Sequence, residues 1–217
     1  MSTHTPIYSI TVGALATNCY LLAAENADAV VIDPGDDGDI IVALEQRHRL
    51  NVRLILNTHG HCDHCGANQY LRSKTGAPIG IHKLDAPLLG SAELNGASLL
   101  GISFTPHNPD FTFADGDVLK IGNLKLKVIH TPGHSEGGCC FFLEGSAGDT
   151  PVLFSGDTLF AGSIGRTDLP GCSPEKMKQS LRRLKKTIPP ETIIYPGHGP
   201  ATSFVEELSK NPYLTNL

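Results

Sequence analysis

Six residues near position 60 carry a high density of side chains that can bind a metal ion. Residues 59–64 read His-Gly-His-Cys-Asp-His and directly follow the apolar run from Val52 to Thr58. Neutral histidine is the commonest metal ligand in proteins, and histidine together with carboxylate suits zinc, iron or manganese. An apolar run followed by a polar cluster indicates a buried strand that delivers these side chains to the edge of a sheet. The stretch therefore predicts a metal centre rather than a polar loop that happens to be rich in histidine.

Three later segments share one pattern, in which an apolar strand meets a glycine and a ligand-type residue follows. They present His134 after Gly133, Asp157 after Gly156 and His198 after Gly197. Glycine lets the backbone turn sharply and come close to another group. Together with the first cluster, the pattern gives seven candidate ligands at strand ends: His59, His61, Asp63, His64, His134, Asp157 and His198.

The chain has ten histidines, and the five outside this set lie at a terminus, on a predicted helix, or in loops and strands. A lone histidine is usually satisfied by hydrogen bonds. We therefore expect structural roles for His4, His48, His82, His107 and His130. Among these, His107 is the best candidate for a place near the site, because it lies in the long loop between Gly90 and Pro109. Loops of that length often border functional sites.

The elements that must position these residues form two similar halves, each made of strands followed by a helix. Hydrophobic periodicity predicts strands at 8–12, 18–24, 29–32, 52–58, 78–81, 118–121, 124–130, 138–143 and 152–154, with a last strand at 192–195. Short helices are predicted at 66–74 and 83–89.

Capping signals place three further helices. One would be capped by Asp37 or Asp39 and would carry its apolar face on Ile40, Ile41, Leu44 and Leu50. A second would have Ser173 as N-cap and Pro174 at its first position, with Met177, Leu181, Leu184 and Ile188 on one face. A third covers residues 203–210, where Ser203 and Glu206 have the spacing of a capping box.

The bulk composition is that of a globular protein and excludes several classes. With 40% hydrophobic and 18% charged residues, the chain of 217 residues is typical of a folded protein rather than a disordered one. The net charge of −5, from 17 basic and 22 acidic residues, lacks the basic excess of a nucleic-acid binder. The sequence shows no secretory-signal pattern and no apolar run long enough for a transmembrane helix, so we expect a cytoplasmic protein.

The six cysteines are then expected to be thiols rather than a disulfide framework. Cys62 and Cys65 have the Cys-x-x-Cys spacing of some redox and zinc sites. The side chain at position 62 should point away from the metal ions, so we expect both thiols to be inert packing groups. Cys139 and Cys140 lie in a predicted strand and are expected in the core.

The ordered set of ligand motifs resembles the metallo-β-lactamase superfamily along nearly the whole chain. This resemblance implies an α+β fold, a four-layer αβ/βα sandwich of two mixed β-sheets flanked by helices, in a single domain spanning residues 1–217. It also implies two divalent metal ions, with zinc preferred to iron or manganese. One ion would be held by His59, His61 and His134 and the other by Asp63, His64 and His198. Asp157 would bridge them.

Two consequences for activity follow from the resemblance. Asp63 is the candidate catalytic residue as well as a metal ligand. The zinc β-lactamases of the superfamily commonly carry Cys or Ser near the position of Asp157, so β-lactam hydrolysis is not expected.

Within the superfamily, three segments most resemble the glyoxalase II-like hydrolases of the short, single-domain type: residues 17–20 (Thr-Asn-Cys-Tyr), 165–168 (Gly-Arg-Thr-Asp) and 195–199 (Tyr-Pro-Gly-His-Gly). The implied reaction is hydrolysis of S-D-lactoylglutathione to D-lactate and glutathione by a hydroxide held between the two metal ions. A thiolate whose conjugate acid has a pKa of about 8.5 can leave without a dedicated general acid.

The expected partner is a small-molecule glutathione thioester, with no nucleic acid and no membrane; the oligomeric state is not indicated by the sequence. Arg166 is the candidate contact for a glutathione carboxylate, because Arg binds carboxylates in bidentate fashion. The alternative for Arg166 is a structural ion pair with Asp168 or another neighbour.

Two other interpretations stay open. A persulfide dioxygenase of the same superfamily carries the same ligand motif and a similar Gly-Arg-Thr-Asp loop. It would hold a single iron through His59, His134 and Asp157 and would oxidise glutathione persulfide. A non-catalytic metal-binding protein is the third interpretation, but such a protein has no need of a complete set of seven ligands. The identity and number of the bound metal ions would separate these interpretations.

Overall fold

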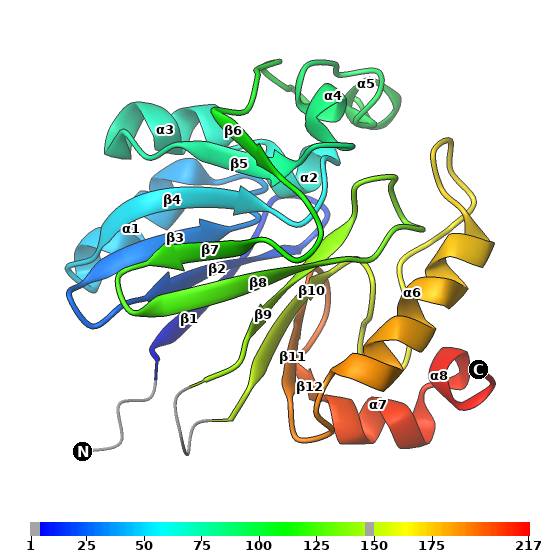
Figure 1. The fold of residues 1–217 in the computed structure, drawn as a ribbon. Helices are drawn as coiled ribbons and strands as arrows, with labels where there is room; N and C mark the ends of the chain where they lie inside the picture. Colours follow the sequence, from blue (N-terminus) through cyan, green and yellow to red (C-terminus); the bar gives the residue numbers. More distant parts are fainter. Residues whose placement is uncertain (1–4, 146–149) are drawn as a thin grey trace.

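The computed structural model describes residues 5–145 and 150–217 and arranges them in four layers (Figure 1). The predicted structural role of His4 falls outside the described residues. The first sheet holds six strands: β1 (Ile7–Val12), β2 (Thr17–Ala23), β3 (Asp28–Ile32), β4 (Asn51–Asn57), β5 (Ile79–His82) and β6 (Phe111–Phe113). The second sheet also holds six: β7 (Val118–Ile121), β8 (Leu124–His130), β9 (Cys139–Leu143), β10 (Val152–Gly156), β11 (Ile193–Pro196) and β12 (Thr202–Ser203).

Both sheets are mixed. In the first sheet β1, β2 and β3 pair antiparallel, and β3 to β6 continue in parallel. In the second sheet β10 and β11 form a parallel pair, and the other neighbours run antiparallel. The predicted α+β sandwich of two mixed sheets flanked by helices is therefore confirmed.

Helices cover the outer face of each sheet (Figure 1). The first half contains α1 (Gly38–Arg47), α2 (Cys62–Cys65), α3 (Asn68–Thr75), α4 (Ala86–Leu89) and α5 (Ala97–Leu100). The second half contains α6 (Pro174–Thr187), α7 (Phe204–Lys210) and α8 (Pro212–Thr215). None of these helices combines the length and apolar character needed to cross a bilayer.

Alternation along the strands creates three separate hydrophobic cores. In β2, Tyr20 and Leu22 face the other sheet, whereas Cys19 and Leu21 pack with α1 and α3 on the outer side. In β9, Phe141 belongs to the core between the sheets and Cys140 to the core beneath α6. Because successive side chains of a strand point to opposite faces, one strand supplies two cores.

The helix predicted from Ser173 is confirmed. The hydroxyl of Ser173 accepts a hydrogen bond of 3.3 Å from the backbone N–H of Lys176, and Met177, Leu181 and Leu184 are buried. The closing helix α7 also has its predicted cap, since the hydroxyl of Ser203 accepts a hydrogen bond from the backbone N–H of Glu206.

The first predicted helix differs from expectation. Asp37 precedes α1, but its carboxylate accepts the backbone N–H of Gly13 at 2.9 Å and makes no cap hydrogen bond. Ile41 is fully buried, whereas Ile40 is 46% exposed and Leu50 lies beyond the end of the helix. Neighbouring helical residues are about 100° apart, so Ile40 and Ile41 cannot both face the sheet.

Several short elements also differ from the predictions. The helix predicted at 66–74 is α3, whereas the short helix α2 before it, inside the metal-binding motif, was not predicted. The strand predicted at 192–195 is not the last, because β12 follows it, and β6 and α8 were not predicted. These elements span two to four residues and are stabilised by pairing or packing with neighbours rather than by a strong local signal.

All six cysteines are free thiols, as predicted, and all but Cys172 are buried. The thiol of Cys65 donates to the backbone carbonyl of His61 at 3.1 Å and Cys62 is 1% exposed, so both act as packing groups.

Candidate metal centre

The seven candidate ligands gather where the two sheets meet, although they come from four segments of the chain. His59 and His61 follow β4, His134 follows β8, Asp157 follows β10 and His198 follows β11. Asp63 and His64 lie on the helical turn α2 rather than at a strand end, which corrects the expectation. The extended backbone of His61 immediately before α2 starts this turn.

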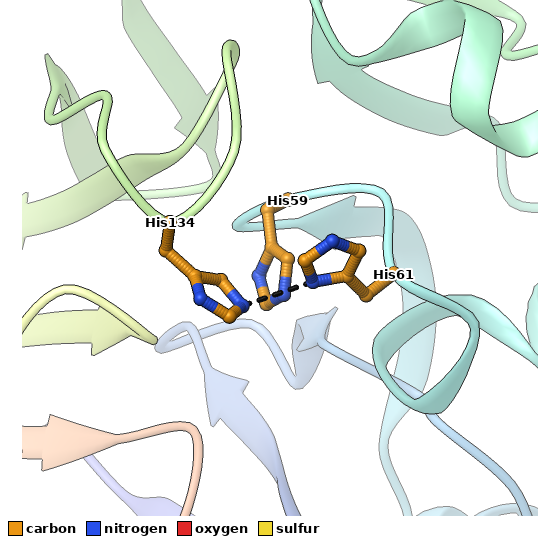
Figure 2. A group of neighbouring side chains, drawn as sticks. All are labelled: His59, His61 and His134. Atoms are coloured by element: carbon orange, nitrogen blue, oxygen red, sulfur yellow. Dashed lines mark hydrogen bonds between the residues drawn. The ribbon is translucent and has the colours of Figure 1, made fainter. Parts of the chain in front are cut away.

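Three histidines from both halves form the first group, which we name the imidazole triad: His59, His61 and His134. Figure 2 shows their rings converging, with Nδ1 of His61 2.9 Å from Nε2 of His134. The ring of His59 lies 4.7 Å and 4.8 Å, centroid to centroid, from the other two. One nitrogen of each ring lies within 4.8 Å of the others, so the three donors can meet at one ion.

A second group, which we name the mixed triad, contains Asp63, His64 and His198. Oδ2 of Asp63 lies 3.5 Å from Nε2 of His64 and 3.3 Å from Nε2 of His198. The two imidazole nitrogens are 3.3 Å apart. The imidazole and mixed triads have the same membership as the two ligand sets implied by the sequence resemblance.

Asp157 lies between the two triads and touches both. Its Oδ2 is 3.4 Å from Nε2 of His134 and 3.6 Å from Nε2 of His198. Its Oδ1 is 3.4 Å from Nε2 of His64. A carboxylate in this position can serve two ions at once.

The ring orientations of three ligands are fixed by hydrogen bonds on the opposite nitrogen. Nδ1 of His134 bonds the backbone carbonyl of Arg166 at 2.9 Å, and Nδ1 of His59 bonds the hydroxyl of Thr58 at 3.1 Å. Nδ1 of His64 bonds the carboxylate of Asp33 at 3.1 Å. Partners of this kind fix the tautomer of a metal-binding histidine and strengthen it as a ligand.

The surroundings of the two triads shift the pKa values of His61 and His64 in opposite directions. Burial, with the neighbouring imidazoles, lowers the pKa of His61 to about 3 and holds the pKa of His59 well below its usual value. At His64 burial also favours the neutral form, but Asp63, Asp157 and Asp33 outweigh it and raise the pKa to about 10.

Neighbouring charges also outweigh burial in setting the pKa values of the other members of the mixed triad. The pKa of His198 is raised, because Asp63 and Asp157 oppose the effect of burial. The pKa of Asp63 is lowered, because His64 and His198 outweigh the effect of burial, and Asp63 is therefore a carboxylate at neutral pH.

Two buried atoms at the centre test whether these residues fit metal ions. Nε2 of His59 and Oδ1 of Asp157 are buried and have no hydrogen-bond partner. Buried polar atoms are nearly always paired, and leaving one unpaired costs free energy. Both atoms face nitrogen and oxygen donors of the kind that bind divalent transition metals. The residues therefore fit divalent metal binding.

Arg166, the candidate substrate contact, has an exposed side chain. Its guanidinium makes two hydrogen bonds to the carboxylate of Asp168, at 2.8 Å and 3.0 Å. This is the ion pair that was the alternative interpretation. The main chain of Arg166 nonetheless belongs to the site, since its carbonyl holds His134.

The other described histidines have structural surroundings. His107 is buried, with its ring nitrogens bonded to Asn68 and to the backbone carbonyl of Thr105. His82 stacks on His130 with centroids 4.2 Å apart, and His48 stacks on Tyr8. None of these four rings belongs to the clusters of potential metal ligands in the described parts of the chain.

Two buried carboxylates near the site were missed by the sequence analysis. Asp33 accepts from the N–H and the hydroxyl of Thr58 and contacts His64. Its sequence signal is that it directly follows a strand and precedes Pro34-Gly35, a turn sequence. Asp85 accepts from Gly60, Ser135 and Gly137. No feature of the local sequence points to Asp85.

Comparison with known proteins places the chain among metal-dependent enzymes. The family described as "Metallo-beta-lactamase superfamily" matches residues 12–198. A Bacillus subtilis protein named "Probable metallo-hydrolase YqgX" is 35% identical over 207 residues, which cover 95% of this chain and 96% of the relative. The hydroxyacylglutathione hydrolase GloC of Haemophilus influenzae is 33% identical over 210 residues, which cover 95% of this chain and 97% of the relative.

Three solved structures share the fold over nearly the whole chain. BLEG-1, described as a B3 metallo-beta-lactamase, has a TM-score of 0.89 at 36% identity and covers 97% of this chain and 100% of its own. TTHA1623 in a di-iron-bound form has a TM-score of 0.84 at 39% identity, and the match covers 95% of this chain and 100% of TTHA1623. ETHE1 from Myxococcus xanthus has a TM-score of 0.79 at 27% identity, and the match covers 97% of this chain and 85% of ETHE1.

Proposed function

The chain belongs to the metallo-beta-lactamase superfamily, and from this premise we propose that it is a dinuclear metal-dependent thioester hydrolase. The observation that carries the proposal is the position of Asp157, whose carboxylate oxygens lie 3.4 Å from His134 and 3.4 Å from His64. One carboxylate thus touches the imidazole triad and the mixed triad together. The proposed enzyme comprises residues 1–217 as one catalytic domain, since the two sheets share a common core.

Metal ions held by the two triads would supply Lewis acidity and lower the pKa of coordinated water toward about 7. Asp63 is the proposed catalytic carboxylate of the chain. It stays ionised at neutral pH, and its Oδ2 accepts a hydrogen bond of 3.1 Å from the hydroxyl of Thr17. A fixed, ionised acceptor can orient an attacking water through a hydrogen bond. We propose zinc as the metal, with iron or manganese as the alternatives.

The proposed substrate is a glutathione thioester, S-D-lactoylglutathione, cleaved to D-lactate and glutathione. The similarity to GloC supports this choice. A thiolate leaves readily, because its conjugate acid has a pKa of about 8.5, so the reaction needs no acid residue beyond the metal ligands. Arg166 is the proposed contact for a carboxylate of the thiol, since its guanidinium is exposed beside the site and already binds a carboxylate.

Two further parts of the proposal rest on bulk properties. We propose no nucleic-acid partner, because the net charge is −5. We propose a cytoplasmic location, because all six cysteines are free thiols.

A mononuclear iron dioxygenase acting on glutathione persulfide is the second candidate. The similarity to TTHA1623, whose structure is a di-iron-bound form, supports iron as a metal for a site of this kind. In this chain the iron would be bound by His59, His134 and Asp157. Nε2 of His134 and Oδ2 of Asp157 lie 3.4 Å apart.

The test is elemental analysis of the purified protein together with three assays: hydrolysis of lactoylglutathione, oxygen uptake with glutathione persulfide, and hydrolysis of a β-lactam. The β-lactam is included because BLEG-1 is described as a B3 metallo-beta-lactamase. Two metal ions per chain with thioester cleavage are expected. One iron per chain with oxygen uptake would establish the dioxygenase instead, and cleavage of the β-lactam alone would overturn the thioesterase.

A further inference from the structure

We propose that Asp85 is a positioning residue for the imidazole triad. Its buried carboxylate fixes the loop that carries His59 and His61 against the loop that carries His134, and so sets the geometry of one metal site without touching the ion. This inference rests on the metal-binding part of the proposed function and not on the choice of substrate.

The hydrogen bonds of Asp85 reach both ligand loops. Oδ2 accepts the backbone N–H of Gly60 at 3.0 Å, and Gly60 lies between His59 and His61. The same oxygen accepts the hydroxyl of Ser135 at 2.7 Å, directly after His134. Oδ1 accepts the backbone N–H of Gly137 at 2.5 Å. The side chain has no solvent exposure, so no water competes for these bonds.

Two glycines allow the loops to approach this carboxylate closely. A Cβ at Gly137 would lie 2.6 Å from the backbone nitrogen of Asp85 and 2.7 Å from its Oδ1. A Cβ at Gly60 would lie 2.6 Å from Cβ of Leu88 and 3.1 Å from the carbonyl oxygen of Asp85. Three of these distances are below 3.0 Å and leave no room for a side chain, so each loop packs directly on the turn from Asp85 to Leu88.

The carboxylate cannot be replaced by its amide without loss. Asp85 accepts three hydrogen bonds from three donors and offers none in return. Asn has one acceptor oxygen and one NH₂ donor. Either rotamer of Asn therefore turns an N–H toward at least one of the N–H or O–H groups, and the loop that loses its acceptor is free to shift.

The mixed triad has a different support. His64 is held by Asp33, and His198 follows a segment whose main chain is bonded to Asn18. Asp85 makes no hydrogen bond to any of these residues in the described parts of the chain. Its loss should therefore act on the imidazole triad alone.

The experiment measures zinc affinity by competition with a chromophoric chelator. It uses two variant proteins, in each of which only one of the two triads stays intact. His198→Ala disables the mixed triad, and His61→Ala disables the imidazole triad. Asp85→Asn is introduced into both. We expect zinc affinity to fall about 10- to 100-fold in the His198→Ala background, the usual effect of removing a partner behind the ligands. In the His61→Ala background we expect a change below about 3-fold.

Glu207 provides a matched control for loss of a buried carboxylate. It is 2% exposed and accepts hydrogen bonds from the N–H of Gly162, the hydroxyl of Thr202 and the amide of Asn211. Glu207→Gln should lower the free energy of unfolding as Asp85→Asn does, but it should leave the zinc affinity of the imidazole triad unchanged. This control separates a general loss of stability from a specific effect on the metal site.

Ser135→Ala keeps the test decisive if Asp85→Asn does not fold. It removes one of the three hydrogen bonds, and we expect a smaller loss of zinc affinity, about 3- to 10-fold, only in the His198→Ala background. Equal losses in both backgrounds, or none in either, would overturn the role of Asp85. Failure of the unmodified protein to bind zinc at all would overturn the proposed metal centre as well.

Discussion

The imidazole triad and the mixed triad lie side by side and both contain histidines. The pKa values of His59 and His61 in the first are lowered, whereas those of His64 and His198 in the second are raised. The pKa of His61 is lowered to about 3, whereas that of His64 is raised to about 10. The His64 side chain is fully buried and the His61 side chain is partly buried. The difference comes from the neighbours, since His61 faces mainly other imidazoles and His64 faces three carboxylates, Asp63, Asp157 and Asp33.

This contrast shows that burial alone does not decide the charge of a histidine. At neutral pH the lowered pKa values of His59 and His61 keep these two rings neutral in the metal-free protein and ready to bind an ion. The metal-free mixed triad holds protons that an incoming ion must displace. The same seven residues therefore provide one site that is open to metal and one site at which metal and protons compete.

The largest expected effect comes from the residue that belongs to both sites. Asp157→Ala should remove both metal ions and reduce kcat/KM by about 10³-fold or more, because both triads lose the carboxylate that joins them. Metal analysis and a thioester assay on the same preparation measure this. Asp168→Ala, on the exposed loop, is the control and should keep both ions. A stoichiometry that remained at two in Asp157→Ala would remove the bridging assignment.

The pH dependence of metal affinity should separate the triads. Protonation of His64, with a pKa of about 10, competes with metal binding throughout the neutral range. In the His61→Ala background, zinc affinity should therefore rise about 100-fold from pH 6.5 to 8.5, tenfold for each displaced proton and pH unit. In the His198→Ala background the lowered pKa values of His59 and His61 keep both rings neutral in this range, so zinc affinity should rise much less with pH. An equal dependence of zinc affinity on pH in the two backgrounds would contradict the proposed difference in protonation between the triads.

Removing one carboxylate that contacts the mixed triad should reduce the difference in pKa between His64 and His61. Asp33→Asn deletes a negative charge 3.1 Å from Nδ1 of His64, so the pKa of His64 in the metal-free protein should fall by about one unit. Titration of the ring signals by NMR measures this shift. Asp28→Asn at the opposite end of β3 is the control, since Asp28 pairs with Arg53 at the surface. An unchanged pKa of His64 in Asp33→Asn would assign the shift to Asp63 and Asp157 alone.

The smallest effect concerns substrate binding rather than metal. Arg166 supports the imidazole triad through its backbone carbonyl, whereas its side chain points to solvent. Arg166→Ala should therefore keep both ions, but it should raise KM about 5- to 10-fold for a glutathione thioester, the cost of one charged contact. For a thioester without glutathione KM should hardly change. Equal changes for both substrates would make the side chain structural.

The sequence predicted which candidate ligands lie close together, because each is a chemically distinctive residue at a recognisable break in the chain. The sequence analysis placed His134, Asp157 and His198 after strand–glycine junctions, and the structure brings all three to one place. The alternation of apolar residues predicted most of the strands, whereas the two mixed sheets were expected from the family resemblance.

The supporting residues could not be predicted in the same way. The partners of Asp85 lie 25, 50 and 52 residues away, and two of them are backbone N–H groups, which every residue except proline carries. Short elements were missed for a related reason. The three residues of β6 form a strand because they pair with β5, not because of their own sequence. The exposed Ile40 shows that periodicity alone leaves the orientation of a helix uncertain by one residue.

Each triad contains residues from both halves of the chain. The stability of the fold should therefore depend on whether metal ions are bound. His61 and His134 are 73 residues apart, and His64 and His198 are 134 apart. An ion bound by either triad is a cross-link that closes a long loop, and such cross-links restrict the unfolded chain most. With metal bound, the two sheets should melt as one cooperative unit. Under metal starvation they would open more readily, and proteases would then set how much of the protein a cell retains.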